Sequence, residues 1–346
     1  MPTDTNTFSL FPLNRFRAFA ALAAAALAVA AITASYALAQ SKASAIGTGV
    51  VVIDTNLAYQ GAQAAGTGMV LTSSGEILTN NHVIRGATTI KVVLPGTGRS
   101  YTAKVVGYDV TDDVAVLQAS GATNLKTVAL GSSATIKVGQ LVKAVGNARG
   151  GGALVKATGQ VTGLSRTITV NDDSGGTATL HHLIETSAAL QPGDSGGPLF
   201  NAAGKVIGMD SAATTSGQYQ DISTTDGYAI PINRALSIAR QITSGKSSAT
   251  VHIGATAFLG ISAAATETEQ PGAVIASVVP GSAADHAGLQ QGDVITAIDG
   301  TKIVSPATVT KIITASKPGT TLTVVYADVS GTSQTARIKL GSGPPQ

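Results

Sequence analysis

The chain has 346 residues, of which 12% are charged and 44% hydrophobic, and its formal net charge is +3. This length predicts two domains after a leader, and the low charge and abundant glycine exclude long disordered segments. The small basic excess forms no cluster, which argues against a nucleic-acid partner. Cysteine is absent, which excludes disulfides, a thiol nucleophile and cysteine metal ligands.

Residues 1–39 have the pattern of a secretion signal. Arg15 and Arg17 precede an alanine-rich apolar run, and no charge follows until Lys42. Ala37-Leu38-Ala39 is a small-x-small cleavage signature. We therefore expect a cleaved signal peptide and a secreted or cell-envelope protein. The alternative is an uncleaved membrane anchor, because the run is just long enough to span a bilayer.

Between Gly47 and residue 230 the chain consists of short β-branched runs separated by Gly, Asn, Asp and Ser. About a dozen such runs predict an all-β domain built as a barrel or sandwich. Apolar residues share one face over Asn233–Ile242, which predicts a closing helix. The segment Ser244–Ser248 has the composition of a linker.

A smaller α+β domain is predicted over residues 257–345. Residues 273–279 alternate like a strand, and Ser282 is expected to cap a short helix that ends at Gly288. A second helix is expected to open at Ser305-Pro306. The segment Gly341–Gln346 is expected to be a frayed end.

Motifs in the all-β part point to nucleophilic catalysis by serine. The segment Gln191–Leu199 surrounds Ser195 with glycines, and a serine hydroxyl needs a base and an oxyanion site to act as a nucleophile. His82 ends one apolar strand and Asp113 starts another. The order His82, Asp113, Ser195 is that of chymotrypsin-like proteases. Asp112 is the alternative acid, and only one of two adjacent residues can face the histidine.

These motifs and the C-terminal pattern resemble the HtrA/Deg trypsin-like serine proteases over about residues 48–345. The resemblance implies a chymotrypsin-like double six-stranded β-barrel over 48–244 and one PDZ domain over 257–345. It implies that His82 is the general base, that Asp113 orients it, and that the backbone of Gly193, Asp194 and Ser195 forms the oxyanion hole. It implies no cofactor and no metal. Asp194 departs from the family, which usually has Asn before the nucleophile.

The resemblance also places a substrate pocket at Ala189, Met209, Asp210 and Ser211. Ala189 stands where trypsin-like enzymes hold the acid that selects Lys or Arg, so we expect cleavage after small or medium apolar residues. If the carboxylate of Asp210 turns into the pocket, a basic side chain would be accepted instead.

Further regulatory and binding residues follow from the same resemblance. Arg166 matches the family's sensor-loop arginine, and Gly146–Gly152 is expected to be a flexible loop of the regulatory region. The loop Phe258, Leu259, Gly260 and Ile261 is expected to bind the carboxylate of a peptide's C-terminus, with Ile312 as part of the wall of the apolar pocket.

The sequence therefore predicts a secreted, cofactor-free serine endopeptidase that degrades unfolded or misfolded extracytoplasmic proteins. Its expected partners are unfolded polypeptides and, through the PDZ domain, C-terminal peptides. A homotrimer is a further expectation, because family members are often trimers. The alternative is a chaperone-like or PDZ-based binding protein that uses an inactive protease scaffold.

Overall fold

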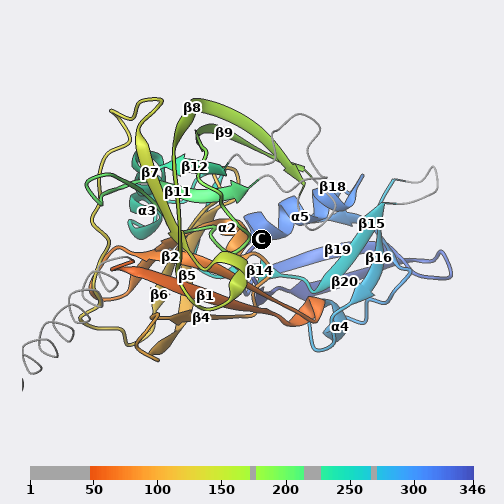
Figure 1. The fold of residues 1–346 in the computed structure, drawn as a ribbon. Coiled ribbons are helices and arrows are strands. Elements are labelled where there is room, and N and C mark those ends of the chain that lie inside the picture. The colour runs from red at the N-terminus through yellow and green to blue at the C-terminus, as the bar shows by residue number, and fades with distance from the viewer. Residues whose placement is uncertain (1–46, 172–176, 214–226, 266–270) are drawn as a thin grey trace, which may run out of the picture. The chain divides into compact units, whose positions relative to one another are not determined.

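The structure, a computed structural model, describes residues 47–171, 177–213, 227–265 and 271–346 (Figure 1). The expected signal peptide at 1–39 lies outside these residues. Within the described ranges, none of the helices combines the length and the apolar character that crossing a membrane requires.

The first part of the described chain is a closed barrel of six strands. Its strands follow the order β5-β4-β1-β2-β3-β6, and the pairing of β5 with β6 completes the ring. β-branched residues pack well on such a pleated surface. The barrel is formed by β1 (Val50–Leu57), β2 (Ala62–Val70), β3 (Glu76–Thr79), β4 (Thr89–Val93), β5 (Ser100–Asp109) and β6 (Val114–Ala119).

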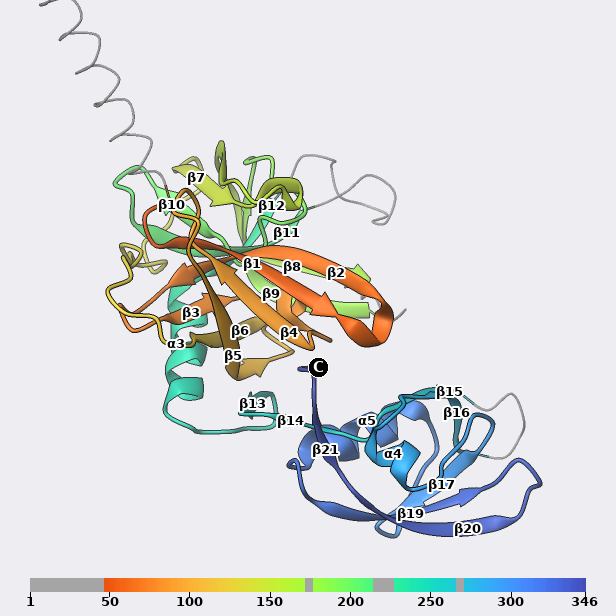
Figure 2. The same ribbon diagram turned by 90° about the horizontal axis from the view of Figure 1, so that it is seen from below.

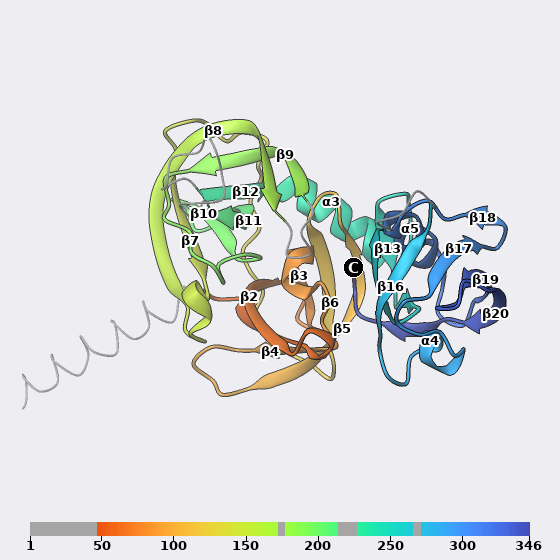
Figure 3. The ribbon, with the colours of Figure 1, turned by 90° about the vertical axis from the view of Figure 1, so that its right-hand side faces the viewer.

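A second closed barrel follows, in the order β10-β11-β12-β9-β8-β7. Figure 3 shows the strands of both barrels. The second barrel is formed by β7 (Leu141–Gly146), β8 (Val155–Asn171), β9 (Thr177–Thr186), β10 (Pro198–Asn201), β11 (Val206–Ala213) and β12 (Gly227–Pro231).

At the start of β1 the neighbours Val50 and Val51 are both buried, although their side chains point to opposite faces of the strand. Val51 belongs to the cluster that fills the first barrel, whereas Val50 belongs to a cluster shared by both barrels. The helix α3 (Ile232–Thr243) closes this shared core with Ile232, Ala235 and Ile242, and its place agrees with the expected closing helix. Strand period alone produces this arrangement, because adjacent side chains point to opposite faces.

Short helical elements join consecutive strands within each barrel. They are the four-residue helix α2 (Asn81–Ile84) and the 3-10 turns η1 (Ala58–Gln60) and η2 (Ala148–Gly150). The strand β13 (Val251–Ile253) pairs with β5 at the edge of the first barrel, although it lies in the stretch between the two expected domains.

The C-terminal part is a smaller α+β domain (Figure 2). Its antiparallel sheet has the order β15-β16-β17-β19-β20, and β18 pairs with β17. The sheet strands are β15 (Ile261–Ala265), β16 (Ala273–Val278), β17 (Val294–Ile298), β18 (Thr301–Lys302), β19 (Thr321–Ala327) and β20 (Ser333–Lys339). Its helices are α4 (Ala283–His286), which Ser282 caps as expected, and α5 (Pro306–Ala315).

The fold class expected from the sequence, two β-barrels followed by an α+β domain, is confirmed. The expectation of a frayed end at Gly341–Gln346 is wrong. Residues Gly341–Gly343 form strand β21, which pairs with β14 (Thr256–Phe258). Pro344 and Pro345 are buried. This end is ordered because its backbone pairs with a segment that is distant in the chain. The composition of residues 341–346 alone does not indicate this pairing.

Candidate active site

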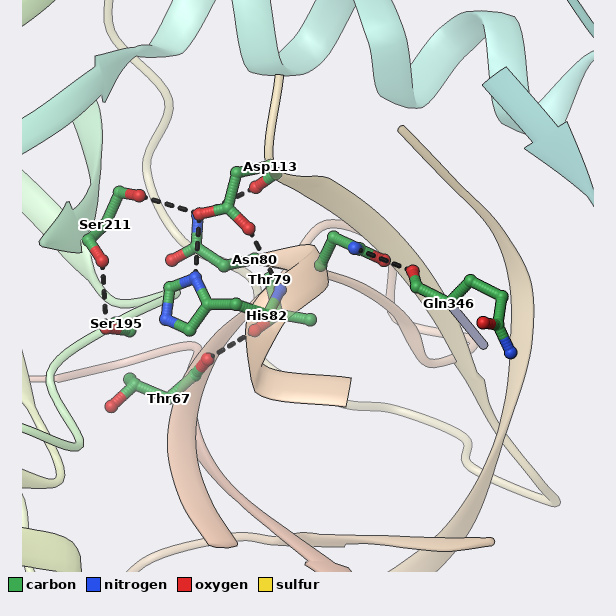
Figure 4. Close-up of polar contacts among 9 residues, drawn as sticks. Thr67, Thr79, Asn80, His82, Asp113, Ser195, Ser211 and Gln346 are labelled. Carbon is green, nitrogen blue, oxygen red and sulfur yellow. Dashed lines mark hydrogen bonds and ion pairs between the residues drawn. The ribbon is translucent and has the colours of Figure 1, made fainter. Parts of the chain in front are cut away.

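The side chains of His82 and Asp113 are in direct contact (Figure 4). Nδ1 of His82 lies 2.8 Å from Oδ2 of Asp113, and the backbone N–H of His82 donates to Oδ1 of the same carboxylate at 2.9 Å. Asn80, two residues earlier, donates from Nδ2 to the Asp113 carbonyl oxygen at 2.9 Å. The start of α2 is therefore bound to Asp113 through backbone and side chains, which holds the imidazole in one orientation.

A turn at the end of β5 presents Asp113 rather than Asp112. Oδ1 of Asp109 accepts the N–H groups of Thr111 and Asp112 at 2.9 and 3.1 Å. Asp113 then has a φ of 53°, a left-handed conformation that Asp tolerates better than most residues. The side chain of Asp112 points elsewhere and forms an ion pair with Arg234 of α3.

Ser195 follows a tight bend at Gly193, which has a φ of 97°. A Cβ on Gly193 would lie 2.2 Å from the carbonyl oxygen of Asn147, so only glycine fits. The hydroxyl of Ser195 donates to the carbonyl oxygen of Ser211 at 3.1 Å, and the hydroxyl of Ser211 donates to Oδ2 of Asp113 at 2.7 Å. Ser211 thus links the serine to the carboxylate (Figure 4).

The loop Gln191–Leu199, here called the serine loop, has two backbone N–H groups that can donate to a substrate. Among the described residues, the N–H groups of Gly193 and Ser195 face no protein acceptor. The N–H of Asp194, which we expected in the same oxyanion hole, instead donates to the carbonyl oxygen of Gln191 at 3.0 Å. The N–H groups of Gly193 and Ser195 can therefore bind a developing oxyanion. The expectation that the Asp194 backbone belongs to the oxyanion hole is wrong.

The residues expected to line the substrate pocket are dispersed by the structure. Ala189 is exposed, but Met209 is fully buried in the core shared by the barrels. Asp210 is also fully buried, and the Ser211 hydroxyl is occupied by Asp113. These positions alternate along β11, so the strand period directs their side chains to different surroundings. The segment 214–226, which follows them, lies outside the described residues.

Asp194 and Asp210 place two buried carboxyl groups beside the serine loop. Oδ2 of Asp194 accepts the N–H of Gln191 at 2.9 Å, whereas its Oδ1 and both oxygens of Asp210 have no partner within the described ranges. Burial raises the pKa of both groups, and the charge of Asp194 raises the pKa of Asp210 further. Both carboxyl groups therefore favour the protonated form more than an exposed carboxyl does.

We predict that Asp210→Asn stabilises the protein at alkaline pH. Because burial raises the pKa of Asp210, the folded state binds this proton more tightly than the unfolded state. The proton on Asp210 therefore contributes fully to the free energy of unfolding at low pH. This contribution is lost as the pH rises through the pKa of Asp210 in the folded protein. Asparagine has no proton to lose, so the variant should be more stable than the wild type by about 1–3 kcal/mol at alkaline pH.

Chemical denaturation across the pH range measures this difference. The stability advantage of Asp210→Asn should shrink as the pH falls toward the ordinary range of a carboxyl group. Asp328→Asn is a control with the opposite shift, because Asp328 is only half-buried and its pKa is lowered to about 2 by hydrogen bonds from Ser330 and Gln334. An unchanged pH profile for Asp210→Asn would contradict the prediction.

Arg166 lies on β8, and its guanidinium pairs with Glu185 on β9. Nε and one terminal nitrogen lie 3.2 and 3.1 Å from Oε2 of Glu185, and the Arg166 side chain is 52% exposed. Glu185 also accepts the hydroxyl of Tyr228 at 3.2 Å. The arginine is therefore attached to the surface of the second barrel, and its regulatory role stays a prediction.

The loop Gly146–Gly152, expected to be flexible, packs beneath the serine loop. Asn147 is fully buried, and its Oδ1 accepts the N–H of Gly152 at 2.7 Å. The N–H of Arg149 donates to the carbonyl oxygen of Pro192 at 2.6 Å. This loop therefore contributes directly to the shape of the candidate oxyanion hole.

A groove in the C-terminal domain lies between the loop Phe258–Ile261 and one face of α5. Val309 and Ile313 line it, because residues four apart share a helix face. Ile312, the expected wall, is not among the lining residues and packs against the domain core. Gln346 also lines the groove.

The residues missed by the sequence reasoning are Thr67, Asn80 and the hydroxyl of Ser211. All of them are buried and polar; Thr67 and Ser211 lie within strands, and Asn80 directly follows β3. Thr67 stands between two glycines in the part of β2 that is otherwise apolar, and this interruption is a signal that could have identified it. Buried polar groups need partners, and here the partners belong to the candidate site.

Two protein-family models match the chain. A trypsin-like peptidase domain matches residues 66–209, and a PDZ domain matches residues 248–327. The first match contains all three residues of the proposed triad, and the second contains the residues that line the groove beside α5 except Gln346.

Curated relatives align with most of this chain. Serine protease PepD of Mycobacterium tuberculosis is 35% identical over 284 residues, covering 78% of this chain and 59% of PepD. A serine protease Do-like HtrA of Bacillus subtilis is 33% identical over 277 residues, covering 76% and 60%. A probable periplasmic serine protease do/HhoA-like of Haemophilus influenzae is 36% identical over 275 residues, covering 78% and 56%. The chain spans less than two thirds of the length of these relatives.

Solved structures agree with these matches. The HtrA-type protease AlgW with a tripeptide is 29% identical, covers 88% of this chain and 96% of its own, and has a TM-score of 0.50. A variant of AlgW, also with a tripeptide, has a TM-score of 0.51 at the same identity and coverage.

Proposed function

Because the chain belongs to the HtrA/DegP-type family of trypsin-like serine proteases with a C-terminal PDZ domain, we propose that it is a serine endopeptidase. The observation that carries the proposal is the double contact of His82 with Asp113, at 2.8 and 2.9 Å, together with the link from Ser195 through Ser211 to the same carboxylate. We assign the protease domain to residues 48–244 and the PDZ domain to residues 257–345.

In the proposed mechanism His82 takes the proton of Ser195 as the hydroxyl attacks a peptide carbonyl, and then gives it to the leaving amine. Asp113 holds the imidazole tautomer with Nδ1 protonated and stabilises the imidazolium. For the attack, the Ser195 hydroxyl turns from the Ser211 carbonyl oxygen toward His82. The N–H groups of Gly193 and Ser195 stabilise the oxyanion.

The proposed substrates are unfolded or misfolded polypeptides outside the cytoplasm. The names of relatives from Haemophilus influenzae and Halomonas elongata, which call those proteins periplasmic, support an extracytoplasmic site. The expected signal peptide supports the same site. An apolar C-terminus is normally buried in a folded protein, so a groove that binds one selects unfolded chains.

Hydrolysis of unfolded casein by the purified protein tests this function. We expect fragments to accumulate, and a serine-directed phosphonate inhibitor should stop their release. Mass spectrometry of the fragments should show cuts after small or medium apolar residues, because Ala189 supplies no charge to pair with a basic side chain. Casein that stays intact while the protein binds it would favour the alternative, a binding protein on an inactive scaffold.

The PDZ groove is proposed to bind the C-terminus of a peptide and to raise protease activity. Gln346 lines the groove, and its main-chain oxygen accepts the side-chain N–H of Asn81 at 2.9 Å, next to His82 (Figure 4). This contact supports communication between the groove and the triad. Arg166 is the proposed residue through which the serine loop responds.

We predict that a peptide ending in Val or Phe raises turnover of a small chromogenic substrate by about fivefold or more, the usual size of such coupling. Arg166→Ala should bind the peptide but lose the activation. Gly260→Val should lose peptide binding itself, because a Cβ on Gly260 would lie 2.1 Å from the side chain of Ser282. Unchanged turnover at saturating peptide would refute the coupling and leave a tethering role.

A further inference from the structure

The carbonyl groups of the serine loop nearest to Ser195 accept hydrogen bonds. Four consecutive residues, 192–195, have their carbonyl oxygens occupied. Pro192 accepts the N–H of Arg149 at 2.6 Å, and Asp194 accepts the N–H of Gly197 at 2.9 Å. In a trans peptide the C=O and the following N–H point in opposite directions. These two bonds therefore direct the N–H groups of Gly193 and Ser195 away, toward the candidate oxyanion site.

One residue, Thr67 of β2, binds the other two carbonyl oxygens, those of Gly193 and Ser195. Its hydroxyl donates to the carbonyl oxygen of Gly193 at 2.7 Å, and its backbone N–H donates to that of Ser195 at 2.9 Å. The same hydroxyl oxygen accepts the N–H of Asn147 at 2.9 Å. Thr67 thus joins the first barrel, the serine loop and the loop that holds Pro192.

This arrangement leaves little room for movement. Thr67 is fully buried, and its own carbonyl oxygen accepts the hydroxyl of Thr79 at 2.7 Å. A Cβ on Gly196 would lie 2.1 Å from the Thr67 carbonyl oxygen, and one on Gly146 would lie 3.0 Å from its hydroxyl. A side chain enclosed so tightly fixes the groups that it binds.

We propose that Thr67 is a positioning residue that keeps the oxyanion hole in its active geometry. The Thr67 hydroxyl donates its single proton to the carbonyl oxygen of Gly193, and its oxygen accepts the N–H of Asn147. One group therefore fixes both the serine loop and the loop that contains Asn147. The proposal rests on the proposed function, because an oxyanion hole matters only to acyl transfer. Its effect should appear in the chemical step, since a misdirected N–H weakens the stabilisation of the transition state more than it weakens substrate binding.

Thr67→Val is the direct test, since valine has the shape of threonine without the hydroxyl. With a chromogenic peptide substrate we expect kcat to fall about 10- to 100-fold with little change in KM. Inhibition by a peptide aldehyde, whose adduct needs the oxyanion hole, should weaken by a similar factor. Thr67→Ser keeps the hydroxyl and should restore activity.

Thr55→Val is the matched control. Thr55 is equally buried in the first barrel, and its hydroxyl donates to the carbonyl oxygen of Ala64 at 3.2 Å, away from the serine loop. It should lose stability and keep its kcat. If Thr67→Val does not fold, Thr67→Ala makes the same test without placing a methyl group against the Gly193 carbonyl.

Two results would overturn the proposal: an unchanged kcat in the hydroxyl-free variant, or equal loss of kcat in Thr67→Ser. Neither would affect the proposed function, which depends on activity in the wild type. If the wild-type protein has no peptidase activity, the proposed function is wrong, and the Thr67 proposal fails with it.

Discussion

Replacement of Ser195 by alanine is expected to lower kcat/KM for a peptide substrate by about four to six orders of magnitude. The variant loses the nucleophile, so no acyl-enzyme forms, while the N–H groups of Gly193 and the loop backbone remain in place. His82→Ala should be comparably inactive, because the hydroxyl then has no base. Steady-state hydrolysis of the chromogenic peptide and of casein measures both variants.

The fold of Ser195→Ala should be unaffected. Within the part of the chain that the structure describes, the only side-chain hydrogen bond lost is the one from the Ser195 hydroxyl to the Ser211 carbonyl oxygen. Circular dichroism and thermal unfolding should therefore match the wild type, and the PDZ peptide should still bind. Full casein hydrolysis by the purified variant would refute the assignment of the nucleophile.

Asp113→Asn is expected to lower kcat by about four orders of magnitude near neutral pH. Its carboxylate accepts the hydroxyl of Ser211 and two N–H groups of His82. An asparagine would place an amide N–H against Nδ1 and select the wrong imidazole tautomer. Kinetics across pH should show the loss, because an imidazolium without its carboxylate is harder to form.

Asp112→Asn is the control for this substitution. The two aspartates are adjacent, but Asp112 pairs with Arg234 and has no place in the proposed triad. The control should keep its kcat and lose little stability, since the pair is partly exposed and surface ion pairs contribute about 0–1 kcal/mol. A larger loss of activity in Asp112→Asn than in Asp113→Asn would reverse the assignment of the acid.

The sequence by itself determined the features that depend on nearby residues. Short β-branched runs separated by turn residues indicate the barrel strands, and a shared apolar face indicates the helix at Asn233–Ile242. The glycines around Ser195 indicate a tight loop, and the structure places Gly193 at a φ of 97° against the Asn147 carbonyl oxygen. Each of these signals lies within a few residues, where backbone sterics and side-chain period act directly.

Only the tertiary structure decided which distant polar groups meet. Ser211 was expected in the substrate pocket, but it binds Asp113, 98 residues away in the chain. Thr67 binds the carbonyl of Gly193 over a separation of 126 residues, and Gly341–Gly343 pairs with Thr256–Phe258. Such contacts arise because the closure of the barrels and the pairing of the last strand bury polar groups that must then be satisfied. Local sequence specifies that these groups are polar, whereas the packing of separate strands specifies their partners.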